Sequence, residues 1–270
     1  MAETDIPNPS STIIYFMLIT LCFIFFTIFN INQTKEIIKT AIALDNKIIN
    51  IVYIFFLVIG SYFINIYISK ALCSYSIQWG YISLITFLPW IIIFVSLYFI
   101  LKIFPGWISP FSNTIGYIII GLLGVEKTYE NIFKTGNEVS GNQELVKAIA
   151  NMNSNRTKFV NQISTNVDDF NNFLVNMKDA IKIDDPDYEK HKLKLYQLLI
   201  IKQFVGKIVW YILAGILISS ISYNLLISMA CEKSLEEIQK DFETSKEKTA
   251  QAGATQAGAA QAGAGQVSAV

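Results

Sequence analysis

The side chains of this sequence that could carry metal or nucleophilic chemistry are few. Its three cysteines, Cys22, Cys73 and Cys231, have neither the CxxC spacing nor the neighbouring histidines of a zinc site. His191 is the only histidine, so a Ser-His-Asp triad would have to use it. We therefore expect neither a zinc site nor such a triad, and we interpret His191 as a polar residue on a helix surface.

The acidic cluster Asp-Asp-Pro-Asp at residues 184–187 has two interpretations. Its carboxylates could bind a cation, but they lack the spaced ligands and the glycine of an EF-hand loop. The alternative is the start of a helix, with an aspartate cap, a proline in the first turn and acidic groups at the positive end of the helix dipole. We favour the helix start.

Phosphate chemistry and acid–base catalysis find no support in the sequence. Gly116, Gly121 and Gly124 lack the Lys-Ser/Thr pair of a phosphate loop, and close helix packing explains them more simply. No pair of titratable side chains stands out as a catalytic acid and base. The formal net charge of zero argues against a nucleic-acid partner. We predict no enzymatic activity, no cofactor, no bound metal and no nucleic-acid partner.

The elements that would position these residues are dominated by long apolar runs. Hydrophobic residues make up 53% of the 270-residue chain and charged residues 16%, and the mean hydropathy is +0.43. Runs of about 20 apolar residues can cross the hydrocarbon core of a bilayer as helices. The sequence therefore predicts an all-α fold, a multi-spanning helical membrane protein with a helical extramembrane region. The predicted spans are residues 12–30, 49–68, 80–101 and 205–230.

Changes in composition divide the chain into six predicted parts. They are a polar N-terminal tail (1–11), a membrane region of three spans and one short apolar segment (12–125), a helical extramembrane domain (126–204), the last span (205–230), a charged helix (231–250) and a Gln-Ala-Gly-Ala tail (251–270). The last tail lacks charge and large apolar residues. We expect it to be disordered because it cannot bury enough surface to offset the entropy of ordering.

Apolar spacing predicts further helices and one irregularity. Residues 31–48, between the first two spans, should form an amphipathic helix, and Pro89 should kink the third span near Leu88. Apolar residues at steps of three and four over 160–181 predict one helix of about 25 residues. No helix breaker follows Asp187, so the helix that begins there should continue rigidly into the last span.

Residues 104–117 read Phe-Pro-Gly-Trp-Ile-Ser-Pro-Phe-Ser-Asn-Thr-Ile-Gly-Tyr. Their two prolines should interrupt any helix, and an aromatic residue here suits the membrane interface. We expect Asn113 to cap a helix that begins near Thr114. A turn at the end of a span and a docking site for a partner protein both explain this segment. The candidate interface residues are Phe104, Pro105, Gly106, Trp107, Pro110, Phe111, Asn113, Gly116 and Tyr117.

The number of spans decides the topology. The apolar run 115–125 is about 11 residues long, which favours an interfacial or re-entrant element over a span. With four spans, the lysine bias of the short loops places both termini on the trans side, although the lysines after residue 230 count against this. Cys73 and Cys231 would then share the trans side, where they could form a disulfide or remain two unrelated thiols. A crossing at 115–125 would separate them.

The segments Phe104-Pro-Gly-Trp107, Ser109-Pro-Phe-Ser-Asn-Thr114 and Gly116-Tyr117 resemble a motif in membrane proteins of nucleocytoplasmic large DNA viruses, of the phycodnavirus and mimivirus kind. The general plan of an apolar N-terminal half, a helical middle and a late span is similar too. The resemblance implies a virion protein of the internal lipid membrane that is tied to the capsid shell. It carries over no catalytic residues.

Ionisable groups are almost absent from the predicted spans, with Lys207 just inside the last one. Transporters and pumps usually place charged groups near mid-membrane, and many contain inverted repeats of broken helices, which are not evident here. We therefore expect a non-enzymatic, multi-pass membrane scaffold of the virion inner membrane and host intracellular membranes. Its expected partners are the lipid bilayer and proteins, with capsid proteins or a second copy as candidates. The alternative function is an ion channel or transporter.

Overall fold

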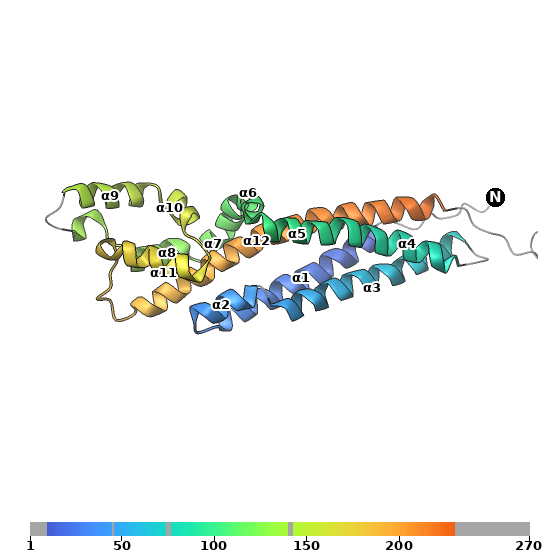
Figure 1. Ribbon diagram of the computed structural model, residues 1–270, viewed down its shortest axis with the longest axis horizontal. Helices are drawn as coiled ribbons and strands as arrows, with labels where there is room; N and C mark the ends of the chain where they lie inside the picture. Colours follow the sequence, from blue (N-terminus) through green and yellow to red (C-terminus); the bar gives the residue numbers. More distant parts are fainter. Residues whose placement is uncertain (1–9, 45, 74–76, 140–142, 230–270) are drawn as a thin grey trace, which may run out of the picture.

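The computed structural model describes residues 10–44, 46–73, 77–139 and 143–229. In these residues the predicted all-α fold is confirmed, because the chain is almost entirely helical and its one extended pairing is an isolated bridge between Phe133 and Ile181. Four helices are long and apolar enough to cross a membrane, by length and composition (Figure 1): Ser10–Gln33, Ile37–Leu72, Trp79–Ile103 and Tyr188–Ile227. The predicted charged helix 231–250 and the Gln-Ala-Gly-Ala tail lie outside the described residues.

The outward faces of these long helices are apolar. Phe25, Phe55, Phe63 and Phe99 come from the first three of them, and each exposes more than half of its surface. Soluble monomeric proteins rarely expose contiguous apolar patches larger than a few hundred Å². This surface is therefore compatible with a multi-pass membrane protein.

The first two spanning helices, α1 (Ser10–Gln33) and α3 (Lys47–Leu72), are joined by a short helix α2 (Ile37–Leu44). The predicted amphipathic helix 31–48 is therefore too long, because both neighbouring helices extend into that range. Asn46 sets the start of α3, since its side chain accepts hydrogen bonds from the backbone N–H groups of Ile48 and Ile49 at 3.1 and 3.3 Å.

The third spanning helix is irregular directly after Pro89, whereas the kink near Leu88 stays a prediction. It consists of α4 (Trp79–Pro89), a π-helical segment (Trp90–Val95) and α5 (Ser96–Ile103). Pro89 has no N–H to donate to the carbonyl of Ile85, four residues earlier. The hydroxyl of Ser222 on the last helix donates to that carbonyl at 2.9 Å, so a neighbouring helix satisfies the freed group.

The prediction that two prolines interrupt the helix here is confirmed for Pro105, because α5 ends at Ile103 and Phe104 leaves helical geometry. It is wrong for Pro110, because Pro105–Leu122 is helical throughout. A 3₁₀ turn (Pro105–Ile108) leads into α6 (Ser109–Phe111), a π-helical segment (Ser112–Gly116) and α7 (Tyr117–Leu122). Both prolines lie in the first turn of their helical pieces, where no N–H donor is required. Gly124 then adopts φ +88°, a conformation that favours glycine, and begins a sharp bend.

The bend at Gly124 sets Pro105–Leu122 and α8 (Val125–Ile132) at 83°. Counted as one broken span, this pair would raise the number of candidate spans to five. Ile120 and Val125, however, are buried together with Leu195 and Leu198 of the last helix in one hydrophobic core. This packing favours an interfacial or re-entrant element over a crossing.

The predicted single helix over 160–181 is also wrong. The chain instead forms α10 (Arg156–Gln162), α11 (Val167–Asn176) and a 3₁₀ turn (Lys178–Ala180), preceded by α9 (Gln143–Ser154). Asn166 breaks the helix because its side chain accepts from the N–H groups of Asp168 and Asp169 and starts α11 afresh. The apolar stripe still packs inward, and Val160 and Phe170 are buried in the same core.

The last helix, α12 (Tyr188–Ile227), runs for 40 residues without a break, which confirms the predicted continuity. At a rise of 1.5 Å per residue it is about 60 Å long. The helix begins at the acidic cluster, as expected. Pro186, however, lies before its first turn, and the Asp187 side chain makes no capping hydrogen bond, so these two parts of the prediction are wrong. Asp185 accepts from the Asp187 N–H at 2.8 Å instead and closes a turn just before the helix.

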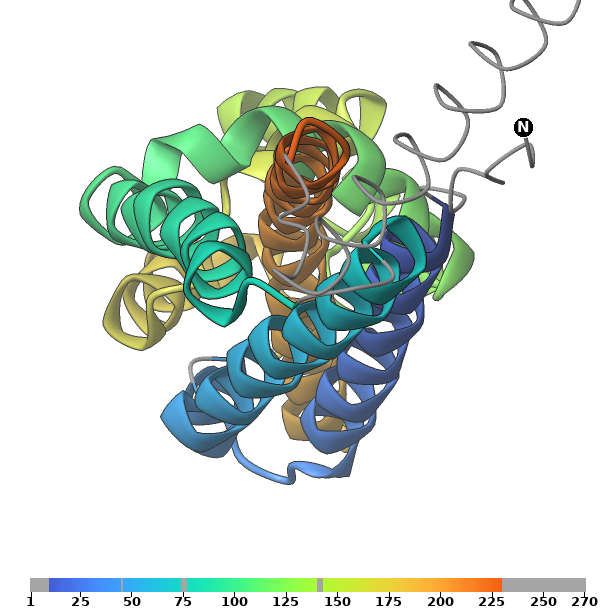
Figure 2. The same ribbon diagram turned by 90° about the vertical axis from the view of Figure 1, so that its right-hand side faces the viewer.

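Helix α12 occupies the centre of the molecule. Viewed from the end where α12 terminates, it is surrounded by the N-terminal helices on one side and by α4 and α5 on another (Figure 2). Its first half shares one hydrophobic core with α2, α7, α8, α9, α10 and α11. These helices and the 3₁₀ turn Lys178–Ala180 together we call the helical domain. Its second half packs with α1, α3 and the third span, which we call the bundle.

Candidate functional site

The segment Pro105–Leu122 lies directly against the backbone of α12. We call it the crossing segment because of this contact with α12, and the name does not refer to passage through a membrane. A Cβ atom on Gly206 would lie 2.8 Å from the Ser112 nitrogen and 2.9 Å from the Ile108 carbonyl oxygen. A Cβ atom on Gly116 would lie 2.5 Å from the Lys202 carbonyl oxygen. Both glycines therefore allow two backbones to approach more closely than any side chain permits. The contact lies where the bundle meets the helical domain.

A buried lysine occupies the middle of this contact. Lys202 exposes 4% of its surface, and its Nζ donates to Asn113 Oδ1 at 3.1 Å and to Asn161 Oδ1 at 3.0 Å. Asn161 also donates from Nδ2 to the Asn113 carbonyl at 3.3 Å. The amide oxygens thus solvate the ammonium group and join α12, the crossing segment and α10. Among the described residues Lys202 forms no ion pair.

Sequence reasoning missed Lys202 and Asn161. A signal was present, because Leu198, Lys202 and Gly206 follow at steps of four and therefore share one face of α12. All three are buried. A lysine between a core leucine and a glycine on one helix face indicates a buried cation.

The aromatic residues of the crossing segment pack on Trp210 of α12. Trp210 Nε1 donates to the Trp107 carbonyl at 2.8 Å, and the two indole rings lie 6.0 Å apart. Phe111 contacts the Trp210 ring edge-on at 5.2 Å. Trp107 still exposes 51% of its surface and Phe104 exposes 57%, which is compatible with the predicted interfacial position.

The remaining predicted interface residues have different surroundings. Asn113 does not cap a helix near Thr114, so that prediction is wrong: it lies inside the π-helical segment and its side chain turns to Lys202. Tyr117 donates to Glu126 Oε1 at 2.8 Å, and the Pro110 carbonyl accepts from the Thr114 hydroxyl. One face of the crossing segment therefore contacts the protein's own helices, and its other face, with Trp107, Ile118 and Leu122, stays exposed.

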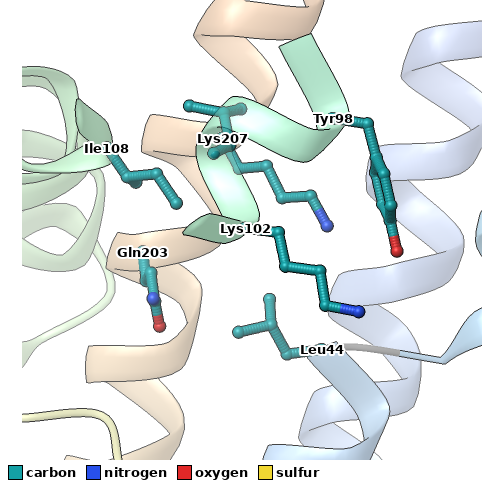
Figure 3. Close-up of a pocket in the computed structure, with 7 residues that line it drawn as sticks. Leu44, Tyr98, Lys102, Ile108, Gln203 and Lys207 are labelled. Atoms are coloured by element: carbon teal, nitrogen blue, oxygen red, sulfur yellow. The ribbon is translucent and has the colours of Figure 1, made fainter. Parts of the chain in front are cut away.

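Two pockets flank α12 at this level, and Ile108 and Gln203 line both. One has a volume of about 230 Å³ and lies between α12, α5 and the end of α2. In Figure 3 the side chains of Lys102 and Lys207 extend into it beside Tyr98. Lys207 also lies 5.5 Å from the centre of the Tyr211 ring.

The second pocket is more polar and has a volume of about 280 Å³. We call it the Lys202 pocket, and its wall comes from the crossing segment, from the chain around α10 and from α12. The residues that line it are Pro105, Gly106, Ile108, Ser109, Ser112, Asn113, Asn161, Gln162, Ile163, Ser164, Thr165, Lys202 and Gln203. None of them is acidic.

The surface of the helical domain has one charge cluster that involves the only arginine. Arg156 Nη1 donates to Glu130 at 2.7 Å and to Glu126 at 3.3 Å, and the guanidinium lies 5.2 Å from the Tyr129 ring centre. The hydrogen bond to Glu130 raises the pKa of Arg156, and the hydrogen bond to Glu126 raises it by a smaller amount. This cluster fastens α10 to α8.

Asp185, Asp187 and His191 present ligand-type atoms within 4.8 Å of one another. All three are at least partly exposed at the start of α12, and Asn131 Nδ2 lies 3.5 Å from His191 Nδ1. Exposed acidic groups of this kind are common without a metal. We therefore assign no metal site to them.

The cysteines differ from one another. Cys73, at the end of α3, is 4% exposed and takes part in a disulfide, whereas Cys22 is an exposed free thiol. The predicted partner Cys231 lies outside the described residues, so the Cys73–Cys231 pairing stays a prediction. At the same end of the bundle, Ile68 of α3 packs on Ile85 and Leu226, and α12 terminates there.

The fold and the crossing contact define a class: an all-α, multi-helical protein with four helices long and apolar enough to span a membrane. Comparisons with protein families, curated proteins and solved structures give no match. Any more specific assignment therefore rests on the geometry described above and on the resemblance of residues 104–117.

Proposed function

We propose that the protein is a non-enzymatic membrane scaffold that holds its helical domain at a fixed position on the bilayer for protein partners. The observation that carries this proposal is the sharing of α12 between two cores. Leu198 and Leu199 are buried in the helical domain, and Phe204 and Ile208 are buried in the bundle only a few residues later. Because the helix does not break between them, the domain has no hinge within α12.

The crossing contact supports the same function. Lys202 ties α10 to α12 through Asn161, and Trp210 holds the Trp107 backbone. These bonds fix the helical domain at the level where tryptophans favour the membrane interface. A scaffold needs this rigidity, because a partner bound to the domain is then positioned relative to the membrane.

Chemical crosslinking of native membranes tests the proposal. Exposed lysines of the helical domain include Lys127, Lys147, Lys158 and Lys178, and Lys70 at the opposite end of the bundle serves as an internal control. An amine-reactive crosslinker should join partner proteins, or a second copy, to the domain lysines and not to Lys70. Crosslinks to Lys70 alone, or ion flux across proteoliposomes that contain only this protein, would contradict the scaffold and favour a channel or transporter.

We further propose, from the resemblance of residues 104–117, that the membrane is the internal membrane of a large DNA virus particle and that capsid proteins are among the partners. The supporting feature is the Phe-Pro-Gly-Trp and Ser-Pro-Phe-Ser-Asn-Thr sequence. Salt-washed, purified particles should retain the protein and release it only with detergent. Release by salt, or absence from particles, would contradict the virion assignment while leaving the membrane scaffold to the crosslinking test.

A further inference from the structure

We propose that the Lys202 pocket binds a phosphate group, carried either by a lipid headgroup or by a free phosphate. The proposal goes beyond the scaffold function and does not depend on it. It starts from the charge of Lys202, whose side chain is buried with two amide oxygens as partners and no carboxylate among the described residues.

An ammonium group has three N–H donors. Two of those on Lys202 are used by Asn113 and Asn161, and no described residue accepts from the third. Asn113 gives its Oδ1 to Lys202, and no described residue accepts from its Nδ2 group. A buried charge with an unused donor costs free energy unless an anion or water completes its shell. Lys202 and Asn113 both line the pocket, so a ligand there lies beside both residues.

The rest of the wall fits an oxyanion. Ser109, Ser112 and Thr165 offer hydroxyl groups, and Gln162 and Gln203 offer amides. No acidic residue among those that line the pocket repels a negative ligand. Lysine commonly binds phosphate as a point charge, with neutral donors completing the shell. The combination is therefore selective for an anion over a cation.

The size and position of the pocket narrow the ligand. Its volume of about 280 Å³ lies at the lower end of ligand pockets, which favours a small anionic group over a large organic molecule. Pro105 and Gly106 line the pocket, and the next residue, Trp107, contacts Trp210. Tryptophan pairs of this kind favour the headgroup level of a bilayer. A phospholipid phosphate can reach the pocket there.

The test uses the purified full-length chain and two probes. Native mass spectrometry compares the retention of phosphatidic acid with that of diacylglycerol, which differs only by the phosphate. Calorimetry measures the binding of inorganic phosphate in detergent. We expect phosphatidic acid, inorganic phosphate or both to bind and diacylglycerol not to bind. Binding of phosphatidic acid identifies a lipid as the source of the phosphate, and binding of inorganic phosphate identifies a free phosphate.

Three variants locate the site. Lys202→Met should weaken binding by at least about tenfold, because it removes a charged hydrogen bond. Asn113→Asp should do the same while keeping the fold, because its carboxylate neutralises the charge of Lys202 and removes the Nδ2 donor. Lys102→Gln removes an equal charge from the neighbouring pocket and should leave binding unchanged.

Four outcomes would overturn the proposal. They are failure of both phosphate probes to bind, equal retention of diacylglycerol, binding that survives Asn113→Asp, and an equal loss with Lys102→Gln. The last result would show that binding follows general surface charge rather than the Lys202 pocket. Thermal unfolding of each variant separates a loss of the site from a loss of the fold, and Asn113→Asp keeps the test decisive if Lys202→Met unfolds.

Discussion

Ser222 on α12 donates a hydrogen bond of 2.9 Å to the carbonyl of Ile85, the group that Pro89 leaves without an intrahelical donor. A helix far away in the sequence thus supplies the donor that a proline in the middle of a span removes. This relationship explains how the third span tolerates Pro89, and it makes α12 a structural partner of the bundle as well as of the helical domain.

Ser222→Ala should destabilise the protein by about 0.6 kcal/mol, the average for a hydrogen bond between helices in a bilayer, and by no more than about 1.7 kcal/mol. Pro89→Ala restores an N–H at position 89 that can serve the Ile85 carbonyl. In the Pro89→Ala background the cost of Ser222→Ala should therefore fall to nearly zero. Thermal unfolding of the four proteins in one detergent measures this double-mutant cycle. Equal costs in both backgrounds would contradict the compensation.

Gly206→Ala should loosen the contact between α12 and the crossing segment. The added methyl group would meet backbone atoms of Ser112 and Ile108, which cannot rotate away. Overpacking of this kind costs about 1–3 kcal/mol. Gly121→Ala is the matched control, because nothing lies within 4 Å of its Cβ position. Alanine should stabilise α7 there by about 0.5–1 kcal/mol. Similar unfolding midpoints for both variants would contradict the close approach.

Arg156→Gln should weaken the attachment of α10 to α8. The variant loses two partly exposed ion pairs and a cation–π contact, which together contribute about 1 kcal/mol. The loss should be smaller at high salt, because salt screens exposed charges. Hydrogen exchange should show faster exchange in α10, with α12 unchanged. Unchanged exchange of α10 at low salt would contradict this role.

Because Cys73 forms a disulfide, we expect the unfolding temperature of the protein to depend on the redox conditions. Peptide mapping without reductant should recover a Cys73–Cys231 linked pair and an alkylated Cys22. Reductant should lower the unfolding temperature of the wild type and of Cys22→Ser, but not that of Cys73→Ser. Recovery of all three thiols as free cysteines in the mature protein would exclude the predicted pairing.

The apolar runs predicted the long helices well because hydrophobic length and helical continuity are local properties of the sequence. The unbroken α12 follows from the same reasoning, since no glycine or proline lies between Asp187 and Val205. The break at Asn166 was missed because the apolar spacing continues unchanged across this residue. Its side chain nevertheless caps a new helix there. Periodicity reports which face is buried, and it does not report where the backbone turns.

The crossing site was predicted only in part. Residues 104–117 stand out by their prolines, glycine and tryptophan, but their partners lie far away in the sequence. Asn113 and Lys202 are 89 residues apart, and Asn161 and Lys202 are 41 apart. Such pairs depend on how α12 packs against the crossing segment, and a single sequence carries no direct signal of that packing.

We conclude that one rigid helix joins the helical domain to the bundle. Spin labels at Lys190→Cys and Leu217→Cys test it most directly, because both positions are exposed on α12 at its two ends. The protein would carry serine at its three native cysteines and be reconstituted in nanodiscs. A Val205→Pro variant provides the broken-helix reference. Electron–electron resonance should give one narrow distance near 40 Å, as expected for 27 residues of continuous helix. A broad or two-peaked distribution, like that of the proline reference, would contradict the claim.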